Sequence, residues 1–423
     1  MRITIVGAGI AGLVTALSLH EAGYRDITIY ERVPKLRALG VGLNLLPHAV
    51  RELTELGLGD RIARLGEQPG ALTYFNRLGQ KIWSEPRGLQ AGYHWPQVSV
   101  NRGDLQLLLI DAVTERLGSH VIKVGHRLLS VEHLADEDIA HFEGPDGGSV
   151  DVRSDLIVGA DGIHSALRKQ HYPTEGRPIW NGLTLWRGTT TAEPFLDGHT
   201  MIMAGDAQQK FVAYPLGLDE KTGRPRVNFI AEHRGGGAAA ETADWNLPVD
   251  PAPILELFDA WQFDWLDVPG IIAAADEILE YPMVDRDPVD QWVFGRSALL
   301  GDAAHAMYPI GSNGASQAII DARTLTFHLA TATDVATALA AYEADRLPTT
   351  AELIRSNRAM GPERVMQIAY ERAPKGFQDV HDVISAEELE EIANGYKRAA
   401  GFHPDILNAR PSLGARILST TEG

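Results

Sequence analysis

Near its start the sequence reads Arg2-Ile3-Thr4-Ile5-Val6-Gly7-Ala8-Gly9-Ile10-Ala11-Gly12, and this stretch decides the fold. Residues 2–6 predict a buried strand, residues 10–22 a helix that ends at Gly23, and residues 27–31 a second strand. The three glycines of the turn let the backbone approach a pyrophosphate, and the free amides at the helix start attract its negative charge. We therefore predict a βαβ unit that binds a dinucleotide.

Glu31, at the end of the second predicted strand, narrows the choice of dinucleotide. A carboxylate there accepts hydrogen bonds from the ribose hydroxyls of an adenosine and repels a 2′-phosphate. The site therefore favours FAD or NAD over NADP, and the adjacent Arg32 is included among its expected contacts.

Two further motifs of glycine and aspartate lie far along the chain from the first. One is Gly159-Ala160-Asp161-Gly162, and the other is Gly301-Asp302-Ala303-Ala304-His305, extended by Pro309, Gly311, Asn313 and Gly314. The Asp302 carboxylate is suited to accept a hydrogen bond from a ribityl hydroxyl, while Gly311 and Gly314 let the chain bend around a ring. The helix predicted from residue 314 directs its N-terminus at that ring, where a reduced flavin is anionic. We expect the chain to fold back twice to complete one cofactor site.

Composition limits the classes of function. The net charge of -18 argues against nucleic acid, whose binding needs a basic surface, and no apolar run is long enough to span a membrane. The 423 residues include no cysteine, which excludes thiolate metal sites, a cysteine nucleophile and a cysteinyl link to flavin. The histidines show no metal-binding spacing, so we predict no metal. These features favour a cytoplasmic protein, and no leader peptide is expected.

The rest of the chain divides by periodicity. Residues 121–158 alternate like short antiparallel strands, residues 180–232 contain strand-like pieces rich in aromatic residues and threonine, and residues 314–333 and most of 336–400 are helical in pattern. We predict a discontinuous FAD-binding domain (1–175 and 281–350), a substrate-binding β-sheet domain (176–280) and a C-terminal helical tail (351–423). The tail is expected to pack on the FAD-binding domain, in a monomer or homodimer.

With these motifs the chain resembles the single-component FAD-dependent aromatic hydroxylases, the group A flavoprotein monooxygenases of the para-hydroxybenzoate and salicylate hydroxylase type. The likeness is strongest to the phenazine hydroxylase branch, on stretches that include Trp83-Ser84-Glu85-Pro86-Arg87-Gly88, Trp186-Arg187-Gly188 and residues 281–288. The resemblance implies an α/β fold: a Rossmann-like FAD-binding domain of the GR2 type, an inserted β-sheet substrate domain and a C-terminal helical region.

The resemblance also implies which residues hold a non-covalent FAD. Arg102 matches an arginine near the flavin phosphates or ribityl chain, Asp161 an aspartate linked to both FAD and NAD(P)H, and Pro309 a proline beside the reactive edge of the flavin. With the motif residues, the expected FAD contacts are Gly7, Gly9, Ile10, Ala11, Gly12, Glu31, Arg32, Gly42, Arg102, Asp161, Gly162, Asp302, Pro309, Gly311, Asn313 and Gly314.

The resemblance implies an enzyme that uses NADH or NADPH and O2 to hydroxylate an aromatic small molecule through a flavin C4a-hydroperoxide. The aromatic would be phenolic, salicylate-like or phenazine-like. No second complete GxGxxG motif is present in the sequence, which fits a family that NAD(P)H visits transiently. The flavin carries the hard chemistry, while the protein excludes water and holds the ring within reach.

Candidates for direct roles are Pro309, Tyr214 and Arg187. Tyr214 would orient or deprotonate a phenolic substrate, and Arg187 would pair with a substrate carboxylate or sit in a core salt bridge. His305 is expected to make a structural hydrogen bond. We expect the pocket wall to include His48, Trp186, Met203, Phe211 and Tyr214.

Two alternatives stay open on the sequence. The same fold supports Baeyer–Villiger oxidation, epoxidation or reduction of a secondary metabolite, which product mass would distinguish from hydroxylation. The other alternative is a flavin-binding protein without turnover, although all three motifs are intact. The WxWxIP motif of flavin halogenases is absent, since Trp261 and Trp265 are followed by Val268-Pro269.

Overall fold

The fold is that of a computed structural model, which describes residues 1–37, 41–219, 222–235 and 247–417. Its centre is a six-stranded sheet of order β20-β21-β11-β1-β2-β7, in which the neighbours run parallel except for β20 and β21. The strands of this sheet are β1 (Arg2–Val6), β2 (Asp26–Glu31), β7 (Ile122–Val124), β11 (Leu156–Gly159), β20 (Val293–Phe294) and β21 (Ser297–Leu299). Strands from three distant parts of the sequence therefore end at one edge.

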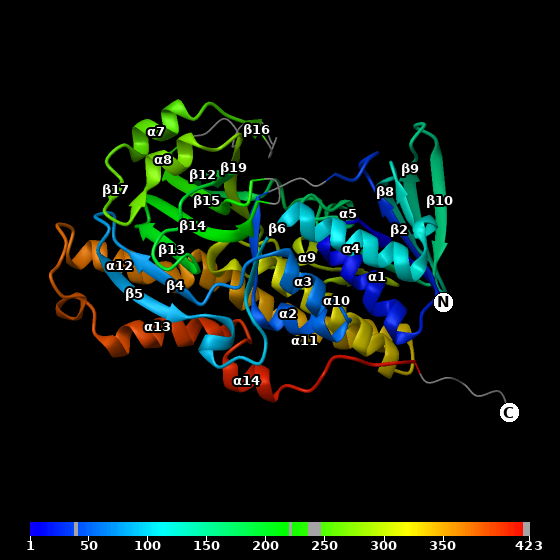
Figure 1. The fold of residues 1–423 in the computed structure, drawn as a ribbon. Coiled ribbons are helices and arrows are strands. Elements are labelled where there is room, and N and C mark those ends of the chain that lie inside the picture. The colour runs from blue at the N-terminus through cyan, green and yellow to red at the C-terminus, as the bar shows by residue number, and fades with distance from the viewer. Residues whose placement is uncertain (38–40, 220–221, 236–246, 418–423) are drawn as a thin grey trace.

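Helices from both ends of the chain pack around this sheet (Figure 1). The predicted βαβ unit is confirmed, because α1 begins directly behind Gly9 and ends at Gly23, which has a left-handed φ of 111°. The helices of this part are α1 (Ile10–Ala22), α2 (Pro47–Glu55), α3 (Gly59–Leu65), α4 (Arg102–Leu117), α5 (Ala166–His171), α9 (Asp302–His305), α10 (Gly314–Thr331) and α11 (Val335–Arg358).

A second, eight-stranded sheet has the order β16-β19-β12-β15-β14-β13-β4-β5. Its strands are β4 (Ala71–Phe75), β5 (Lys81–Pro86), β12 (Ile179–Thr191), β13 (Thr200–Gly205), β14 (Gln209–Leu218), β15 (Pro225–Arg234), β16 (Leu247–Pro248) and β19 (Ile278–Asp285). The hairpin of β4 and β5 joins this sheet through a parallel pairing of β4 with β13, although it precedes the other strands by a long stretch of chain.

The two faces of the eight-stranded sheet have different partners. One face packs against α7 (Ala252–Phe258) and α8 (Val268–Ala273), which we call the outer face. The other, inner face packs against α12 (Arg364–Arg372) and α13 (Ala386–Ala399). Figure 1 shows α7 and α8 on the opposite side of this sheet from α12 and α13.

The C-terminal segment returns to the first domain after α14 (Pro404–Ala409). The Arg51 guanidinium on α2 donates to the carbonyl oxygen of Leu407 at 2.9 Å, and the amide of Ile417 donates to the carbonyl oxygen of Ala22 at 2.9 Å. The tail is thus packed on α2 and on the end of α1, and through α13 it also reaches the inner face of the eight-stranded sheet. Residues 418–423 of the predicted tail lie outside the described ranges.

Smaller elements complete the chain. They are the sheet of β8 (Arg127–His133), β9 (Asp138–Glu143) and β10 (Ser149–Ser154), the pair β3 (Gly42–Leu45) and β6 (Val98–Asn101), the pair β17 (Gln262–Phe263) and β18 (Leu266–Asp267), and the 3-10 turns η1 (Gly88–Ala91), η2 (Ser119–Val121), η3 (Ile310–Ser312), η4 (Gly361–Glu363) and η5 (Val380–Asp382). In the described part of the chain, every helix is too short or too polar to cross a membrane.

The predicted fold class is confirmed: a Rossmann-like α/β domain, a β-sheet domain inserted between its strands and a C-terminal helical region. The domain boundaries remain a proposal. Helix α11 runs through residue 350 without a break, and the strands β4 and β5 belong to the eight-stranded sheet although they lie within residues 1–175.

Candidate functional site

The first glycine turn leaves an open space at the start of α1. Gly7 has a φ of 105°, and a Cβ on it would overlap the carbonyl oxygen of Ala160. A Cβ on Gly12 would overlap the carbonyl oxygen of Gly7. A Cβ on Gly9, by contrast, would meet no atom of the described residues within 4 Å. Gly9 caps α1 without a side-chain hydrogen bond, so the helix presents free amides to this space. The Glu31 carboxylate lies next to it and accepts from the amide of Ala8 at 2.8 Å.

The second motif follows β11, directly beside β1. One Asp161 oxygen accepts from the amide of Ala166 at 2.7 Å, whereas Oδ1 is buried and has no hydrogen-bond partner in the described ranges. Burial raises the pKa of this carboxyl group. An unsatisfied buried carboxylate oxygen is costly, so Oδ1 indicates a missing donor such as a ligand hydroxyl or amide.

The third motif brings the other end of the chain to the same place. Gly301 has a φ of 63°, and its Cβ position is 3.2 Å from the methyl groups of Ala11 on α1 and Ala318 on α10. Its amide donates to the carboxylate of Asp321 at 3.0 Å. His305 makes the structural hydrogen bond expected of it, with Nε2 2.5 Å from Asp321. Asp302 itself begins α9 and is exposed.

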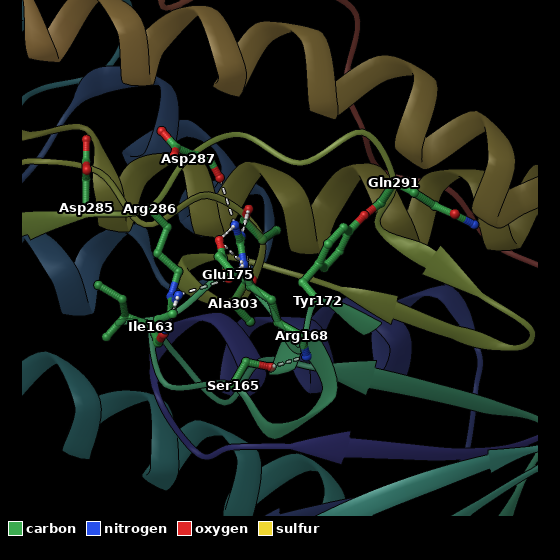
Figure 2. A network of polar contacts seen from close by, with 12 residues as sticks. Ile163, Ser165, Arg168, Tyr172, Glu175, Asp285, Arg286, Asp287, Gln291 and Ala303 are labelled. Carbon is green, nitrogen blue, oxygen red and sulfur yellow. Dashed lines mark hydrogen bonds and ion pairs between the residues drawn. The ribbon is translucent and has the colours of Figure 1, made fainter. Parts of the chain in front are cut away.

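A buried arginine that sequence reasoning did not assign to the site joins the second and third motifs (Figure 2). Arg168, which is only 1% exposed, donates to the carbonyl oxygens of Ala303 at 3.2 Å and Ala304 at 2.6 Å, and its Nε lies 2.9 Å from Glu175. Arg286 completes the network, because it donates to Glu175 at 2.9 Å and to the Ile163 carbonyl oxygen at 2.7 Å. In the sequence, only the place of Arg168 shortly after the second motif pointed to it.

The segment from Pro309 to Gly314 turns in front of α10. Gly311 has a φ of 67°, and a Cβ there would overlap the Tyr396 hydroxyl of α13. The side chain of Asn313 is buried and points to Tyr396, so it does not cap α10. Pro309 is exposed, and a Cβ on Gly314 would meet no described atom within 4 Å. The start of α10 is therefore a second helix N-terminus with free amides and open space.

Gly42 is the point where the inner face meets the first domain. Its amide donates to the side-chain oxygen of Asn228 at 2.6 Å, and its carbonyl oxygen accepts from Arg187 at 2.8 Å. A Cβ on Gly42 would lie 2.8 Å from the Tyr214 ring. Arg187 thus bonds a main-chain carbonyl, and its Nε is buried without a partner among the described residues. Burial raises the pKa of Tyr214 to about 12, so its hydroxyl is protonated at neutral pH.

The remaining expected cofactor contacts lie around the same space. The amide of Arg102, the first residue of α4, donates to the carbonyl oxygen of Val41 at 3.1 Å. Arg32 follows β2 and is exposed. It lies near the second motif, because its charge, after burial and the charge of Arg286, contributes to lowering the pKa of His164. The structure thus brings the three motifs and the Gly42 loop together, as expected for one cofactor site.

Strand register divides the expected pocket residues between two faces. Cross-strand partners share a face, and one row runs from Arg187 through Ile230 and Val212 to Met203 on the inner face. The adjacent row holds Trp186 and Phe211, which pack in the outer-face cluster with α7 and α8. The expectation that Trp186 and Phe211 line the pocket is therefore corrected: a shift of one residue turns a side chain to the opposite face.

A cavity lies between the inner face, α13 and the segment after Pro309. It holds about 20 Å³ of free space, and its lining includes Met203, Gly311 and Ser312 with Leu46, Leu72, Met201 and Phe402. We call it the inner cavity. His48 lies behind its wall, stacked on Phe402 with ring centroids 4.8 Å apart. A second cavity of about 380 Å³, on the Tyr308 and Ile310 side of the same segment, is lined by residues such as Lys210, Glu232 and Glu363.

The residues present fit an FAD. Two helix N-termini with free amides face open space, one suited to a pyrophosphate and the other to the anionic ring of a reduced flavin. Glu31 lies beside the open space of the first turn, where a ribose would bind, and Asp161, with its unpartnered Oδ1, follows β11, the strand paired with β1. In the part of the chain described, three or more metal-ligating side chains do not gather into one site.

Comparison with known proteins bears on the identity of this site. The chain matches the family described as "FAD binding domain" over residues 1–207 and 270–357. It is 42% identical over 361 residues to phenazine 1,6-dicarboxylic acid hydroxylase PhzS of Lysobacter antibioticus, covering 84% of this chain and 89% of that protein. It is 30% identical over 361 residues to 3-hydroxybenzoate 6-hydroxylase 1 of Aquipseudomonas alcaligenes, covering 83% and 86% respectively.

Solved structures show the same fold. Klebsiella pneumoniae HpxO, complexed with FAD and uric acid, aligns with a TM-score of 0.74 at 24% identity, over 97% of each chain. At this identity the likeness concerns the fold alone, which places an FAD-bound structure on the same architecture. Given the family match, the relatives and the geometry of the three motifs, the chain belongs to the FAD-dependent aromatic hydroxylases, which are flavoprotein monooxygenases.

Proposed function

We propose that this FAD-dependent aromatic hydroxylase acts on a fused-ring aromatic of the phenazine type, with NADH or NADPH as its reductant. Similarity supports the ring type, because identity to the phenazine 1,6-dicarboxylic acid hydroxylase is 42%, against 30% for the 3-hydroxybenzoate and salicylate hydroxylases. The net reaction converts the aromatic, O2, NAD(P)H and a proton into the hydroxylated aromatic, water and NAD(P)+.

The observation that carries this proposal is the inner cavity. One side of it is the segment that would hold the flavin ring. The other side is an apolar wall formed by Met201 and Met203 of the eight-stranded sheet and by Phe402 between α13 and α14. Its free space is small, and methionine side chains are flexible enough to open it for a flat ring. An aromatic placed here would lie against the flavin segment and away from bulk water.

FAD, when bound, supplies electron transfer from NAD(P)H and the activation of O2. The chain's own residues hold and orient the reactants. Pro309 and the free amides at the start of α10 would border the flavin ring and stabilise its negative charge. Because its hydroxyl stays protonated, Tyr214 would orient the substrate or flavin edge as a hydrogen-bond donor rather than act as a base. Arg187 would hold the Gly42 loop through its hydrogen bond to the Gly42 carbonyl oxygen.

The test is NADH and NADPH oxidation by the holoenzyme, with O2 uptake and product mass, over phenazine carboxylates, salicylate and 3-hydroxybenzoate. We expect phenazines to stimulate oxidation most and to yield a product heavier by one oxygen atom. Hydroxylation of the single-ring acids alone would contradict the ring type. Stimulation that releases only hydrogen peroxide would contradict the proposed placement of the ring.

We also infer that the enzyme acts in the cytoplasm as a monomer or homodimer. The absence of cysteine in the sequence supports a location without need for disulfides, and NAD(P)H is available there. Light scattering coupled to gel filtration gives the mass of the holoenzyme, and a mass above that of a dimer would contradict the inferred assembly.

A further inference from the structure

The inner cavity contains a cluster of charges that the hydroxylation chemistry does not use. The charged side chains that line it are Arg87, Lys397 and Glu85, which we call the basic cluster. Glu85 lies between the two cations: its Oε1 is 2.8 Å from Nη2 of Arg87, and its Oε2 is 2.8 Å from Nζ of Lys397. Glu85 is buried, with a side-chain exposure of 4%, and the two cations are mostly buried, with exposures of 12% for Arg87 and 13% for Lys397.

The basic cluster carries one positive charge more than it carries negative charges. Burial by itself would raise the pKa of Glu85, but the charges of Arg87 and Lys397 leave it lowered, so the carboxylate is ionised. Burial by itself would lower the pKa of Arg87, but Glu85 leaves it raised, so the guanidinium keeps its charge. The nearby Glu363 is bonded to Lys210, which Glu232 shares, and in the described ranges it forms no ion pair with Arg87 or Lys397. A buried, uncompensated positive charge is unfavourable unless an anion joins it.

Polar atoms without partners lie around the same cluster. Nε of Arg87, the Tyr93 hydroxyl and Oε1 of Gln97 are buried and lack hydrogen-bond partners in the described ranges. Gln97 lines the inner cavity, and Tyr93 is close enough to Arg87 to interact with its charge. Two of these groups are donors, and unsatisfied buried donors are rare in proteins unless a ligand completes them. The whole inner cavity has about 20 Å³ of free space, so a small polar group fits beside these atoms at once, whereas the ring of the acid requires the methionine side chains of the apolar wall to move.

From this geometry we propose that Arg87 and Lys397 bind the carboxylate of an aromatic acid and so select carboxylated substrates. This rests on the proposed function, since the aromatic ring of that acid would occupy the neighbouring apolar part of the cavity. Arg87 offers the planar donors that suit a carboxylate, and Lys397 adds a second charge from α13. Several relatives have carboxylic acids in their names, including phenazine 1,6-dicarboxylic acid, 3-hydroxybenzoate and salicylate.

The second cavity is a weaker candidate for binding an acid. Basic and acidic side chains are equal in number along its lining, and Lys210 there is shared by Glu232 and Glu363. Arg187 is the other cation of the inner face; it donates to the carbonyl oxygen of Gly42 and its Nε has no described partner, but it does not line the inner cavity. An anionic group on a ring in the inner cavity therefore meets the cations of the basic cluster.

The experiment compares an acid with its neutral amide. Phenazine-1-carboxylate and phenazine-1-carboxamide are titrated into oxidised holoenzyme without NAD(P)H, and the dissociation constant is read from the change in flavin absorbance. Lys397→Met and Arg87→Met each remove one cation. Arg398→Met is the matched control, because it is the next residue of α13 and is exposed. Arg187→Met tests the competing cation, and Arg87→Lys tests whether charge alone suffices.

We expect the wild type to prefer the acid by roughly tenfold or more, which corresponds to at least about 1.4 kcal/mol. Lys397→Met and Arg87→Met should weaken acid binding by about ten- to a hundredfold and change amide binding by less than about threefold. Arg398→Met should leave both constants unchanged. If Arg87→Met fails to fold, Lys397→Met alone still tests whether the basic cluster binds the carboxylate.

An acid preference that persists in both variants, or that disappears only in Arg187→Met, overturns the assignment to the basic cluster. A separate outcome concerns the proposed function. If phenazines fail to bind the wild type while salicylate binds more tightly than salicylamide, and Lys397→Met abolishes that difference, the basic cluster is supported and the phenazine ring type is rejected.

Discussion

The Tyr396 hydroxyl of α13 lies 2.9 Å from the Asn313 side-chain nitrogen, at the start of helix α10. The same hydroxyl is 3.2 Å from the Ile310 carbonyl oxygen and 3.1 Å from the side-chain oxygen of Asn357. The C-terminal helical region therefore fixes, through one buried hydroxyl, the segment 310–313 that we propose borders the flavin ring.

Tyr396→Phe should loosen this segment without leaving a cavity, because the phenyl ring fills the space of the tyrosine ring. We expect the free energy of unfolding to fall by about 1–3 kcal/mol, because buried polar groups lose their partner. FAD should still bind, but more of the NAD(P)H consumed should appear as hydrogen peroxide and less as product. The ratio of product to NAD(P)H oxidised measures this. Tyr370→Phe on α12 is the control, and equal ratios in the two variants would contradict the role of Tyr396.

Gly9 and Gly12 allow fold and cofactor effects to be separated within one turn. Gly12→Ala places a methyl group on the Gly7 carbonyl oxygen and should lower the melting temperature of the apoprotein. Gly9→Ala should leave that temperature unchanged, since Gly9 has a φ of -75° and an open side. The new methyl group lies where we place the pyrophosphate, so FAD affinity should fall by roughly tenfold or more. Normal FAD content in Gly9→Ala would place the pyrophosphate elsewhere.

Arg168 should matter for both stability and FAD retention. Arg168→Met leaves the carbonyl oxygens of Ala303 and Ala304 without their donor and Glu175 with Arg286 alone. We expect a loss of about 3–5 kcal/mol in the free energy of unfolding, as for other broken buried ion pairs. FAD should dissociate more readily, because α9 carries Asp302. Urea unfolding with FAD absorbance measures both effects. Lys169→Met, which removes the exposed neighbouring cation, should change neither.

The sequence predicted those parts of the site that are local. Each glycine motif follows a buried strand and precedes a helix or turn, so spacing alone indicated its role. The β4–β5 hairpin gave no comparable signal, because its place is set by pairing with β13, far along the chain. Tyr396 and Lys397 reach the site only through tertiary packing of α13. No local pattern in the sequence marks that contact.

The faces of the inner strands could not be predicted for a related reason. Strand β13 is buried along its whole length and β14 along most of it, so polar and apolar residues do not alternate there. Met203 and Tyr214 were placed on the pocket side together with Trp186 and Phe211, which lie on the other face. Pairing register, which the sequence does not display, separates the two sets.

Tyr214→Phe distinguishes an orienting hydroxyl from a catalytic base. With its pKa raised to about 12, Tyr214 should remain protonated across the working range of the enzyme. We expect turnover to fall, but the shape of the kcat/KM profile between about pH 6 and 9 should match that of the wild type. If the kcat/KM of the wild type rises with pH and that of Tyr214→Phe does not, Tyr214 acts as a catalytic base.

His48 should make the protein sensitive to acid. Burial lowers its pKa from 6.5 to about 3, helped by the charges of Arg410 and Arg346 and opposed only weakly by the side chain of Asn313. Below pH 6.5 the unfolded chain binds a proton at this residue that the folded chain does not. The stability from neutral His48 is therefore complete above pH 6.5 and is lost as the pH falls towards 3.

The expected loss from this one group is about 1.4 kcal/mol per pH unit within that window. His48→Phe keeps a ring against Phe402 but cannot take up a proton, so its free energy of unfolding should fall less steeply on acidification. Urea unfolding at about pH 7, 6 and 5, at one saturating FAD concentration, gives the two slopes. His120→Phe, at an exposed histidine, should keep the wild-type slope. If His48→Phe keeps it as well, His48 is protonated in the fold, and its buried nitrogens must then have a hydrogen-bonding partner such as a ligand or water.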